Sequence, residues 1–421
     1  MKLRILTFNV FFDEVARSAR MKAIGRLVER ARPAVIGFQE VTRESLALLK
    51  AQSWARFYDC SVDTAPPFQE AYFVALFSAL PVTSLETHPF SNTGMGRELV
   101  LMQVEPVPGL SLFVGTSHLE SLPQFAGPRV AQLKESLNLL RDRVNNAEGD
   151  SDEEAVVVGR KRGFGQSSGS GGGGRVCLGA VFMGDTNLLP ADMKLLDRRL
   201  AAVANVDVEL AKSGRSKCRR CGGKIEKDAV RVGKMAKDKV AGGKVLEIRE
   251  WFHENCFVGG DGATEDEKKL ARRKGKELRG EQVEQGDGDG VDLATAGLPG
   301  GWKDLWLSVP GNTEENGYTF DGTRNLLVMN RSFRSRLDRM YFYPAPNEEA
   351  AMCTFDEIVI VGQQKIADGL WSSDHFGLLS TFTIRGENEE SGSAMGGGKK
   401  KTRQTTSDLL AGSKQSPISI D

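Results

Sequence analysis

Short apolar runs alternate with amphipathic helical stretches along residues 1–145, which predicts a mixed α/β fold. Strands are expected at 3–10 and 34–39, on either side of a helix at 14–32 whose apolar residues recur at helical spacing. Pro33 ends this helix, because the residue before a proline avoids the α-helical conformation. The alternation continues with strands at 72–77, 98–104, 111–117 and 176–183 and with a helix at 130–144.

Strand-like runs return late in the chain, so the predicted α/β domain is split along the sequence. They lie at 338–343, 355–361 and 376–384 and assign 1–205 and 291–385 to one domain. Three segments break the pattern: an expected flexible surface loop at 150–175, a charged linker at 259–290 with a short helix at 265–278, and a disordered basic tail at 386–421. The basic cluster at 399–403 suits either a nuclear import signal or a solubilising end.

Charge is distributed unevenly, although the whole chain of 421 residues is neutral, with 56 Lys and Arg against 56 Asp and Glu. Residues 212–249 carry 13 basic and 4 acidic side chains, a net charge of +9, so the remainder carries −9. This pattern excludes a uniformly basic nucleic-acid binder and favours a small basic module inserted into an acidic domain. No apolar run approaches the ~18 residues of a membrane span, and six cysteines in this length indicate the reduced thiols of a cytosolic or nuclear protein.

Short polar segments follow directly on several predicted strands or directly precede one. They are Thr7-Phe8-Asn9, Gln39-Glu40, Ser117-His118-Leu119-Glu120-Ser121, Gly184-Asp185-Thr186-Asn187, Arg336-Leu337-Asp338-Arg339 and Ser373-Asp374-His375. A buried strand holds the side chains at its end rigidly, and α/β folds build their sites at such ends. One such segment would be an ordinary polar strand end, but six in one chain predict a shared site.

The residue types in these segments suit the hydrolysis of a phosphate diester. Glu40 is a hard oxygen ligand of the kind that Mg²⁺ prefers, and Asp185 can orient or deprotonate an attacking water. Asn9 and Asn187 are neutral, so they can position water or a phosphoryl oxygen without repelling an anion.

His375 adds a cation to this predicted site. A protonated imidazole can stabilise the charge that develops on the phosphoryl oxygens, and Asp338 can hold the ring and raise its pKa. Electrostatic stabilisation supplies most of the catalysis in metal-assisted in-line attack. Together the segments therefore predict a metal-assisted phosphodiester hydrolase.

The order of the motifs TFN, QE, SHLES, GDTN, LDRMYF and SDH resembles that of the endonuclease/exonuclease/phosphatase superfamily. This resemblance covers about residues 1–205 and 291–385 and implies a four-layer αββα sandwich with an active-site Mg²⁺ or Mn²⁺ ion. The SHLES motif, the run Glu70-Ala71-Tyr72-Phe73 and the segment after Ser373 look like the branch of tyrosyl-DNA phosphodiesterases. Members of that branch remove topoisomerase II remnants by cutting 5′-phosphotyrosyl–DNA bonds.

The resemblance implies a role for each of the polar residues. It places the metal at Glu40, with Asn9 and Asp374 near the ion, and makes Asp185 the group that activates water. It also implies contacts to the scissile phosphate from Asn187, His118 and His375, the last oriented by Asp338.

A groove for the single-stranded 5′ end is implied around Tyr72, Arg97 and Phe320, because aromatic rings stack on unpaired bases. Packing within the groove wall is an equal alternative for these three. The chain departs from the usual pattern at three positions: Phe11 stands where an acidic residue is common, Leu189 where an Arg is common, and Phe320 where a Trp is usual. These departures are expected to affect substrate binding more than hydrolysis.

Two short knuckles in the basic module, Cys218-x2-Cys221 and His253-x2-Cys256, have the spacing of a zinc site. Three Cys and one His make a closed tetrahedral Zn²⁺ site, which can stabilise a unit too small for a core of its own. Residues 207–258 resemble the zinc finger of poly(ADP-ribose) polymerases, which recognises DNA nicks and ends. The resemblance implies phosphate contacts from Arg215 and Arg231 and a base-capping role for Val245. A basic surface alone would give salt-sensitive, sequence-independent DNA binding.

These observations predict a nuclear, monomeric, Mg²⁺-dependent DNA-repair phosphodiesterase that the finger docks on a strand break. Its expected partners are DNA with strand breaks or 5′-protein adducts, the topoisomerase II remnant being the adduct removed, and no membrane is expected. Two alternatives stay open: another DNA-repair nuclease of the superfamily, such as an abasic-site endonuclease or an exonuclease, and a break-sensing adaptor with a weakly active hydrolase domain. A lipid or inositol phosphatase would share the metal machinery but would have no use for a DNA-break finger.

Overall fold

The computed structural model describes residues 1–62, 71–147, 176–196, 206–239, 245–281, 292–346 and 352–385. The loop expected at 150–175 and the tail expected at 386–421 lie outside the described residues, as does the second part of the linker, from 282 onward.

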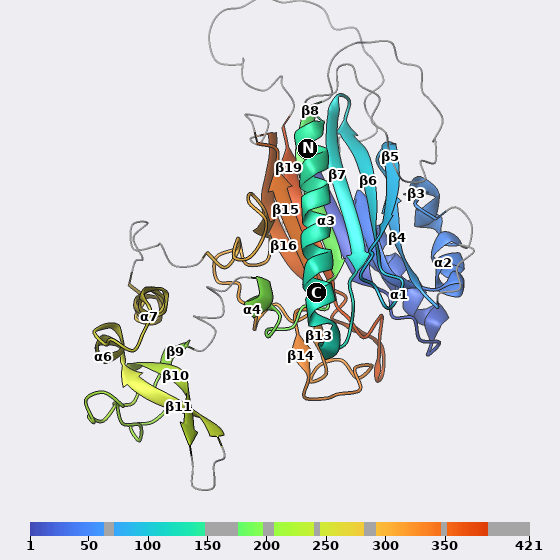
Figure 1. Cartoon of the computed structure of the whole chain (residues 1–421). Coiled ribbons are helices and arrows are strands. Elements are labelled where there is room, and N and C mark those ends of the chain that lie inside the picture. Colours follow the sequence, from blue (N-terminus) through green and yellow to red (C-terminus); the bar gives the residue numbers. More distant parts are fainter. Residues whose placement is uncertain are drawn as a thin grey trace, which may run out of the picture.

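Two six-stranded sheets form the main body (Figure 1). The first has the strand order β16 (Cys353–Val361), β19 (Gly377–Ile384), β1 (Lys2–Asn9), β2 (Val35–Val41), β4 (Phe73–Ser78) and β3 (Asp59–Cys60). The second has the order β12 (Lys303–Asp304), β15 (Asp338–Pro344), β8 (Val176–Asp185), β7 (Leu110–His118), β6 (Glu98–Val107) and β5 (Val82–Pro89). The pairs β1–β2 and β7–β8 are parallel and all other neighbours are antiparallel.

Each sheet buries both of its faces, which explains the long apolar strands. On β1, Leu3 and Ile5 point into a core shared with the second sheet, whereas Leu6 and Phe8 pack on the opposite face. That outer face is covered by α1 (Arg17–Ala31) and α2 (Arg43–Lys50), and α3 (Ala126–Asn146) covers the outer face of the second sheet (Figure 1). The layers therefore run helix, sheet, sheet, helix, and the predicted αββα sandwich is confirmed.

The first helix is shorter than the predicted 14–32, but it buries most of the predicted apolar face, from Ala23 to Ala31. Its buried side chains include Arg20, Ile24 and Leu27, whereas Val15, assigned to the apolar face, lies before the helix and is 45% exposed. Residues 10–15 form a loop instead, because their carbonyl groups bond to the Arg20 side chain.

The inserted segment folds as a small module, drawn in green to olive in Figure 1. It contains the sheet of β9 (Val206–Leu210), β10 (Val230–Lys239) and β11 (Val245–His253), followed by α6 (Glu254–Val258) and α7 (Glu265–Leu278). The helix predicted within the linker is thus present, but it packs on the module: Ala271 is fully buried against Val206, Val232 and Phe257. Glu267, which completes a capping box with Thr264, also pairs with Lys234 of β10 at 2.9 Å.

No helix in the described part of the chain combines the length and the apolar character needed to cross a membrane.

Candidate active site

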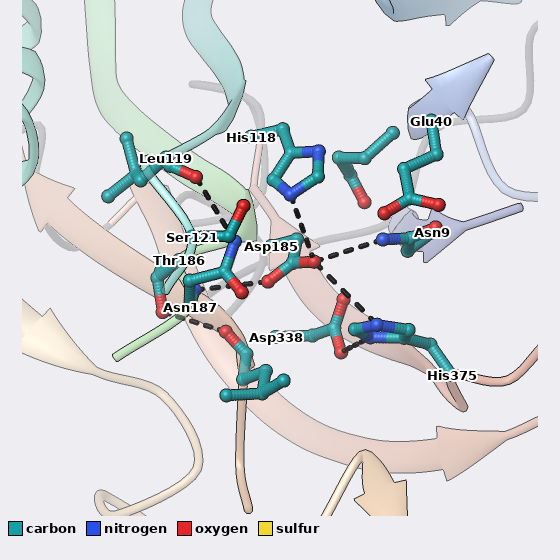
Figure 2. Close-up of polar contacts among 12 residues, drawn as sticks. Asn9, Glu40, His118, Leu119, Ser121, Asp185, Thr186, Asn187, Asp338 and His375 are labelled. Atoms are coloured by element: carbon teal, nitrogen blue, oxygen red, sulfur yellow. Dashed lines mark hydrogen bonds and ion pairs between the residues drawn. The ribbon is translucent and has the colours of Figure 1, made fainter. Parts of the chain in front are cut away.

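The topology brings all six polar segments to one edge of the sandwich (Figure 2). The parallel strands β7 and β8 end in register at His118 and Asp185, and Asp185 in turn lies opposite Asp338, where the antiparallel β15 begins. In the other sheet, Asn9 and Gln39 pair at the ends of β1 and β2. Parallel strand ends and antiparallel strand starts therefore deliver their side chains to one place.

The glycine of the GDTN segment permits the close approach of β7 and β8. Gly184 has a φ of 152°, and a Cβ added there would lie 2.1 Å from the carbonyl oxygen of Ser117. Any other residue would push β8 away from β7 and would separate Asp185 from His118.

Asp185 is the centre of the site and is 1% exposed. Its Oδ2 accepts a hydrogen bond from Asn9 Nδ2 at 2.9 Å and lies 3.4 Å from His118 Nε2 and 3.7 Å from His375 Nε2 (Figure 2). Its Oδ1 accepts the Asn187 N–H at 3.0 Å. Burial alone would raise the pKa of Asp185, but the neighbouring imidazoles and the Asn9 amide outweigh it and lower the pKa. The carboxylate therefore stays ionised and can accept a hydrogen bond from water.

His375 is held between two carboxylates. Its Nδ1 lies 2.8 Å from Asp338 Oδ2, and the backbone N–H of Asp338 donates to Thr319 Oγ1 at 3.0 Å. Burial would lower the pKa of His375, but the charges of Asp338 and Asp185 outweigh it and hold the pKa well above its ordinary value. An imidazolium is therefore favoured at this position.

Glu40 lies on the far side of Asp185 from Asp338 (Figure 2). Its Oε2 accepts a hydrogen bond from the backbone N–H of Phe12 at 3.1 Å. The backbone of Glu40 itself adopts a left-handed conformation, with a φ of 56°. Burial and the nearby charge of Asp374 raise the pKa of Glu40 to about 7. One ligand atom each from Glu40, His118 and Asp185 lies within 4.8 Å of the others. Two carboxylates and a neutral imidazole nitrogen at this spacing form a donor set that suits a divalent cation.

Asp374 stands apart from this donor set. Among the described residues it is absent from the groups whose ligand atoms lie within 4.8 Å of one another. Burial raises the pKa of Asp374 to about 6. Its neighbour Ser373 donates a hydrogen bond to the carbonyl oxygen of Asn9 at 2.7 Å.

The three predicted groove residues flank the two histidines. The ring of Tyr72 stacks on His118 with centroids 5.8 Å apart. The rings of Phe320 and His375 pack edge to face, with centroids 4.8 Å apart. Arg97 is 5% exposed and donates to the Tyr72 hydroxyl at 3.2 Å, so it braces the ring from within the groove wall. Burial, assisted by the charge of Arg97, lowers the pKa of His118 to about 3 and leaves the ring neutral.

In the inserted module, the four knuckle side chains converge. Cys218, Cys221, His253 and Cys256 each place one ligand atom within 4.8 Å of the others. His253 Nδ1 lies 3.4 Å from Cys221 Sγ, and its Nε2 lies 3.0 Å from the carbonyl oxygen of Lys224. The second contact fixes the tautomer that turns Nδ1 towards the thiols.

The residues expected to bind DNA through the module differ in accessibility. Arg215 is exposed. Arg231 is 8% exposed; its guanidinium lies 3.7 Å from the centroid of the Trp251 ring and bonds to Glu209, so the structure gives it an internal role in place of the expected phosphate contact. Val245 begins β11, but its side chain lies outside the described residues.

Three supporting residues escaped the sequence reasoning: Thr319, Phe12 and Arg20. Arg20 alone carried a usable signal, because it precedes Ile24 by four positions and so lies on the buried face of its helix. Thr319 and Phe12 act through long-range hydrogen bonds, to Asp338 and Glu40, that form only in the folded chain.

Residues 6–375 match the model of the Endonuclease/Exonuclease/phosphatase family. The chain belongs to this family. Among curated relatives, Tyrosyl-DNA phosphodiesterase 2 of Homo sapiens is 32% identical over 147 residues, which are 34% of this chain and 39% of that protein. The 5′-tyrosyl-DNA phosphodiesterase of Caenorhabditis briggsae is 25% identical over 154 residues, 35% of this chain and 41% of that protein. The chain thus spans about two fifths of the length of these relatives.

A solved structure of TDP2 from D. rerio, complexed with a single-strand DNA product, shares the fold of this family member. It aligns with a TM-score of 0.50 at 20% identity and covers 91% of this chain and 99% of that chain.

Two departures from the family pattern have local explanations in the structure. Phe11 adopts a φ of 61° and donates its backbone N–H to Asn9 Oδ1 at 2.9 Å, so its backbone supports the site although its side chain is apolar. Leu189 donates its N–H to Asp192, which pairs with the buried Arg129 at 2.8 Å.

Proposed function

We propose that this protein is a metal-dependent DNA-repair phosphodiesterase that hydrolyses 5′-phosphotyrosyl–DNA bonds and leaves a 5′-phosphate. The proposal rests above all on the convergence of Asp185, Glu40 and the His375–Asp338 pair at one edge of the sandwich. The names of both curated relatives support the tyrosyl-DNA substrate. A topoisomerase II remnant is the adduct that best fits this chemistry.

The side chains divide the work of in-line hydrolysis. Asp185 accepts a hydrogen bond from the attacking water and directs its lone pair at phosphorus, while Asn9 holds the carboxylate in place at 2.9 Å. The cationic His375 and the amide of Asn187 stabilise the charge that develops on the phosphoryl oxygens. The tyrosine leaves on the side of phosphorus opposite the water.

Glu40 would hold the divalent cation, with Asp185 and Asn9 beside it. The donor set fits such a cation. Burial and the neighbouring charge of Asp374 raise the pKa of Glu40, and a bound cation would relieve the repulsion between these two carboxylates. When bound, Mg²⁺ or Mn²⁺ supplies Lewis-acid polarisation of the phosphoryl oxygens.

The inserted module would bind Zn²⁺ through Cys218, Cys221, His253 and Cys256 and would dock the enzyme on strand breaks. Support comes from the convergence of the four ligand atoms and from the net charge of +9 over 212–249. Exposed basic side chains such as Arg215 and Lys217 suit sequence-independent contacts to phosphates. The proposal includes a nuclear location, where damaged DNA is found, and a monomeric enzyme.

A panel of oligonucleotides tests the proposed substrate. The full chain is offered 5′-phosphotyrosyl, abasic and 3′-blocked DNA, with and without Mg²⁺. Release of tyrosine from the first substrate alone, and only with the metal, supports the proposal. Cleavage of abasic or 3′-blocked DNA instead identifies another DNA-repair nuclease of the family, and break binding without any turnover identifies the adaptor.

A further inference from the structure

Arg20 is a fully buried arginine whose side chain is devoted to one loop. It is 0% exposed and donates to the backbone carbonyl oxygens of residues 10–15, namely Val10 at 2.7 Å, Val15 at 2.7 Å, Phe11 at 3.2 Å, and Asp13. The guanidinium also lies 5.1 Å from the centroid of the Phe11 ring. A planar fork with five N–H donors can satisfy several acceptors at once, which an ammonium group cannot do in the same geometry.

The loop that Arg20 holds turns its own N–H groups towards the site. Phe11 donates to Asn9 Oδ1 at 2.9 Å, and Phe12 donates to Glu40 Oε2 at 3.1 Å. The loop is strained, because Phe11 and Ala16 have φ values of 61° and 45°, which side-chain-bearing residues rarely adopt. Such a conformation persists only when the surrounding contacts over-determine it, and Arg20 supplies those contacts.

We propose that Arg20 is a positioning residue that sets the orientation of Glu40 and Asn9 through the backbone of residues 10–15. The inference rests on the proposed function in that it treats Glu40 as the metal ligand. Arg20 fixes the loop through its backbone carbonyl groups. The N–H groups of Phe11 and Phe12 then hold one side-chain oxygen each, that of Asn9 and that of Glu40. Glu40 is then held with its carboxylate beside Asp185 and His118, and Asn9 is held with its Nδ2 donating to Asp185.

A positioning role and a purely electrostatic role of Arg20 predict opposite effects of its replacement on cation binding. If Arg20 acted only as a buried positive charge near Glu40, its removal would relieve repulsion and would tighten the binding of a divalent cation. If it acts by positioning, a lysine that keeps the charge but loses the fork will let the loop relax and will weaken binding. Loss of a supporting contact to a ligand commonly costs 10–100-fold in metal affinity.

The test is Mn²⁺ affinity, measured by electron paramagnetic resonance on the full chain without any substrate. Arg20→Lys and Arg20→Met should each weaken Mn²⁺ binding about tenfold. The matched control is Arg129→Lys, a second fully buried arginine that bonds to the backbone carbonyl oxygens of Glu120 and Leu122. It should lower the melting temperature but leave Mn²⁺ affinity unchanged.

Wild-type affinity in a folded Arg20→Lys variant, or tighter binding in Arg20→Met, would overturn the positioning role. A wild-type protein that binds no Mn²⁺ would instead refute the proposed metal site, so the two failures are distinct. Should both variants fail to fold, amide hydrogen exchange in the wild-type protein decides. If the Phe11 and Phe12 amides are protected from exchange as well as those of β1, the positioning role of Arg20 is supported. If they exchange without protection, that role is overturned.

Discussion

Asp338 lies directly opposite Asp185 in the antiparallel ladder of β15 and β8, and His375 contacts both carboxylates. The ring nitrogen nearer Asp338 lies 2.8 Å from its carboxylate, whereas the other nitrogen lies 3.7 Å from that of Asp185. One strand pairing thus sets the distance between Asp185, the proposed water-orienting group, and Asp338, which keeps the imidazole charged.

Asp338→Asn should shift the pH dependence of hydrolysis. The charge of Asp338 holds the pKa of His375 well above its ordinary value, so the wild-type ring stays cationic as pH rises through neutrality. Without that charge, burial lowers the pKa, and the cation is lost at lower pH. We expect kcat to fall by about 10²–10⁴-fold at pH 8 and the alkaline limb of the profile to move to lower pH. An unshifted profile for tyrosine release would contradict this role.

Asp185→Asn and His375→Ala should separate hydrolysis from DNA binding. Neither change removes a basic side chain from the inserted module, so affinity for broken DNA should persist within about threefold, whereas tyrosine release falls by about 10³-fold or more. Single-turnover kinetics and fluorescence anisotropy on the same oligonucleotide check both statements. Wild-type turnover in both variants would show that the assigned roles are wrong.

Cys221→Ser should remove one metal equivalent per chain and weaken binding to nicked DNA by about tenfold, because a closed zinc site maintains the folding of such a small unit. Elemental analysis for zinc and a binding isotherm at fixed salt measure the two effects. Cys60→Ser, on β3 of the main body, is the matched control and should retain the zinc. Zinc retained by Cys221→Ser at the wild-type stoichiometry would exclude the proposed ligand set.

Arg336→Met should destabilise the fold strongly. Arg336 is 1% exposed and bonds to both carboxylate oxygens of Asp304 and to Glu314, so its removal takes a buried cation and its hydrogen bonds from these two acids. Since Arg339 remains to pair with both acids, we expect the free energy of unfolding in urea to fall by about 2–4 kcal/mol. Lys2→Met, which removes the exposed Lys2–Asp356 pair, should change it by about 1 kcal/mol at most. Equal losses in the two variants would contradict this account of burial.

Glu86→Gln should remove part of the acid sensitivity of the fold. Hydrogen bonds with His88 and Arg143 lower the pKa of Glu86 to about 2 in the folded protein. Because the folded pKa is depressed, the stabilisation is present above the ordinary carboxyl pKa near 4.5 and is lost as pH falls towards about 2. The variant should lose about 1–2 kcal/mol of unfolding free energy at pH 7 and progressively less below pH 4.5. A constant difference from pH 7 to pH 2.5 would rule out this linkage, and Glu135→Gln on α3 is the exposed control.

Much of the site was predictable because its residues end or begin strongly apolar strands. Asn9 and Asp185 follow buried runs whose period and composition identify strands without any tertiary information. Their shared edge follows from the rule that α/β sheets place ligands at strand ends. The register that sets Asp185 opposite Asp338 is a long-range pairing that local patterns do not encode.

The supporting contacts were not predictable for a different reason. Phe12 and Thr319 act through backbone N–H groups, which are the same in every residue and leave no trace in the sequence. Arg231 shows the converse, since the resemblance to the zinc finger implied a phosphate contact for it, whereas its side chain is buried. Its cross-strand partner in β9 is Glu209, and that pairing turns the guanidinium inward.

The central position of β1 in its sheet has a consequence for synthesis. Its neighbours are β2, made soon after it, and β19, whose residues Gly377–Ile384 leave the ribosome hundreds of residues later. The inserted module needs only nearby segments and can fold during translation, whereas the site around Asp185 is incomplete until Ser373–His375 and β19 have emerged. The nascent chain therefore completes the inserted module, the proposed DNA-binding unit, before it completes the proposed active site.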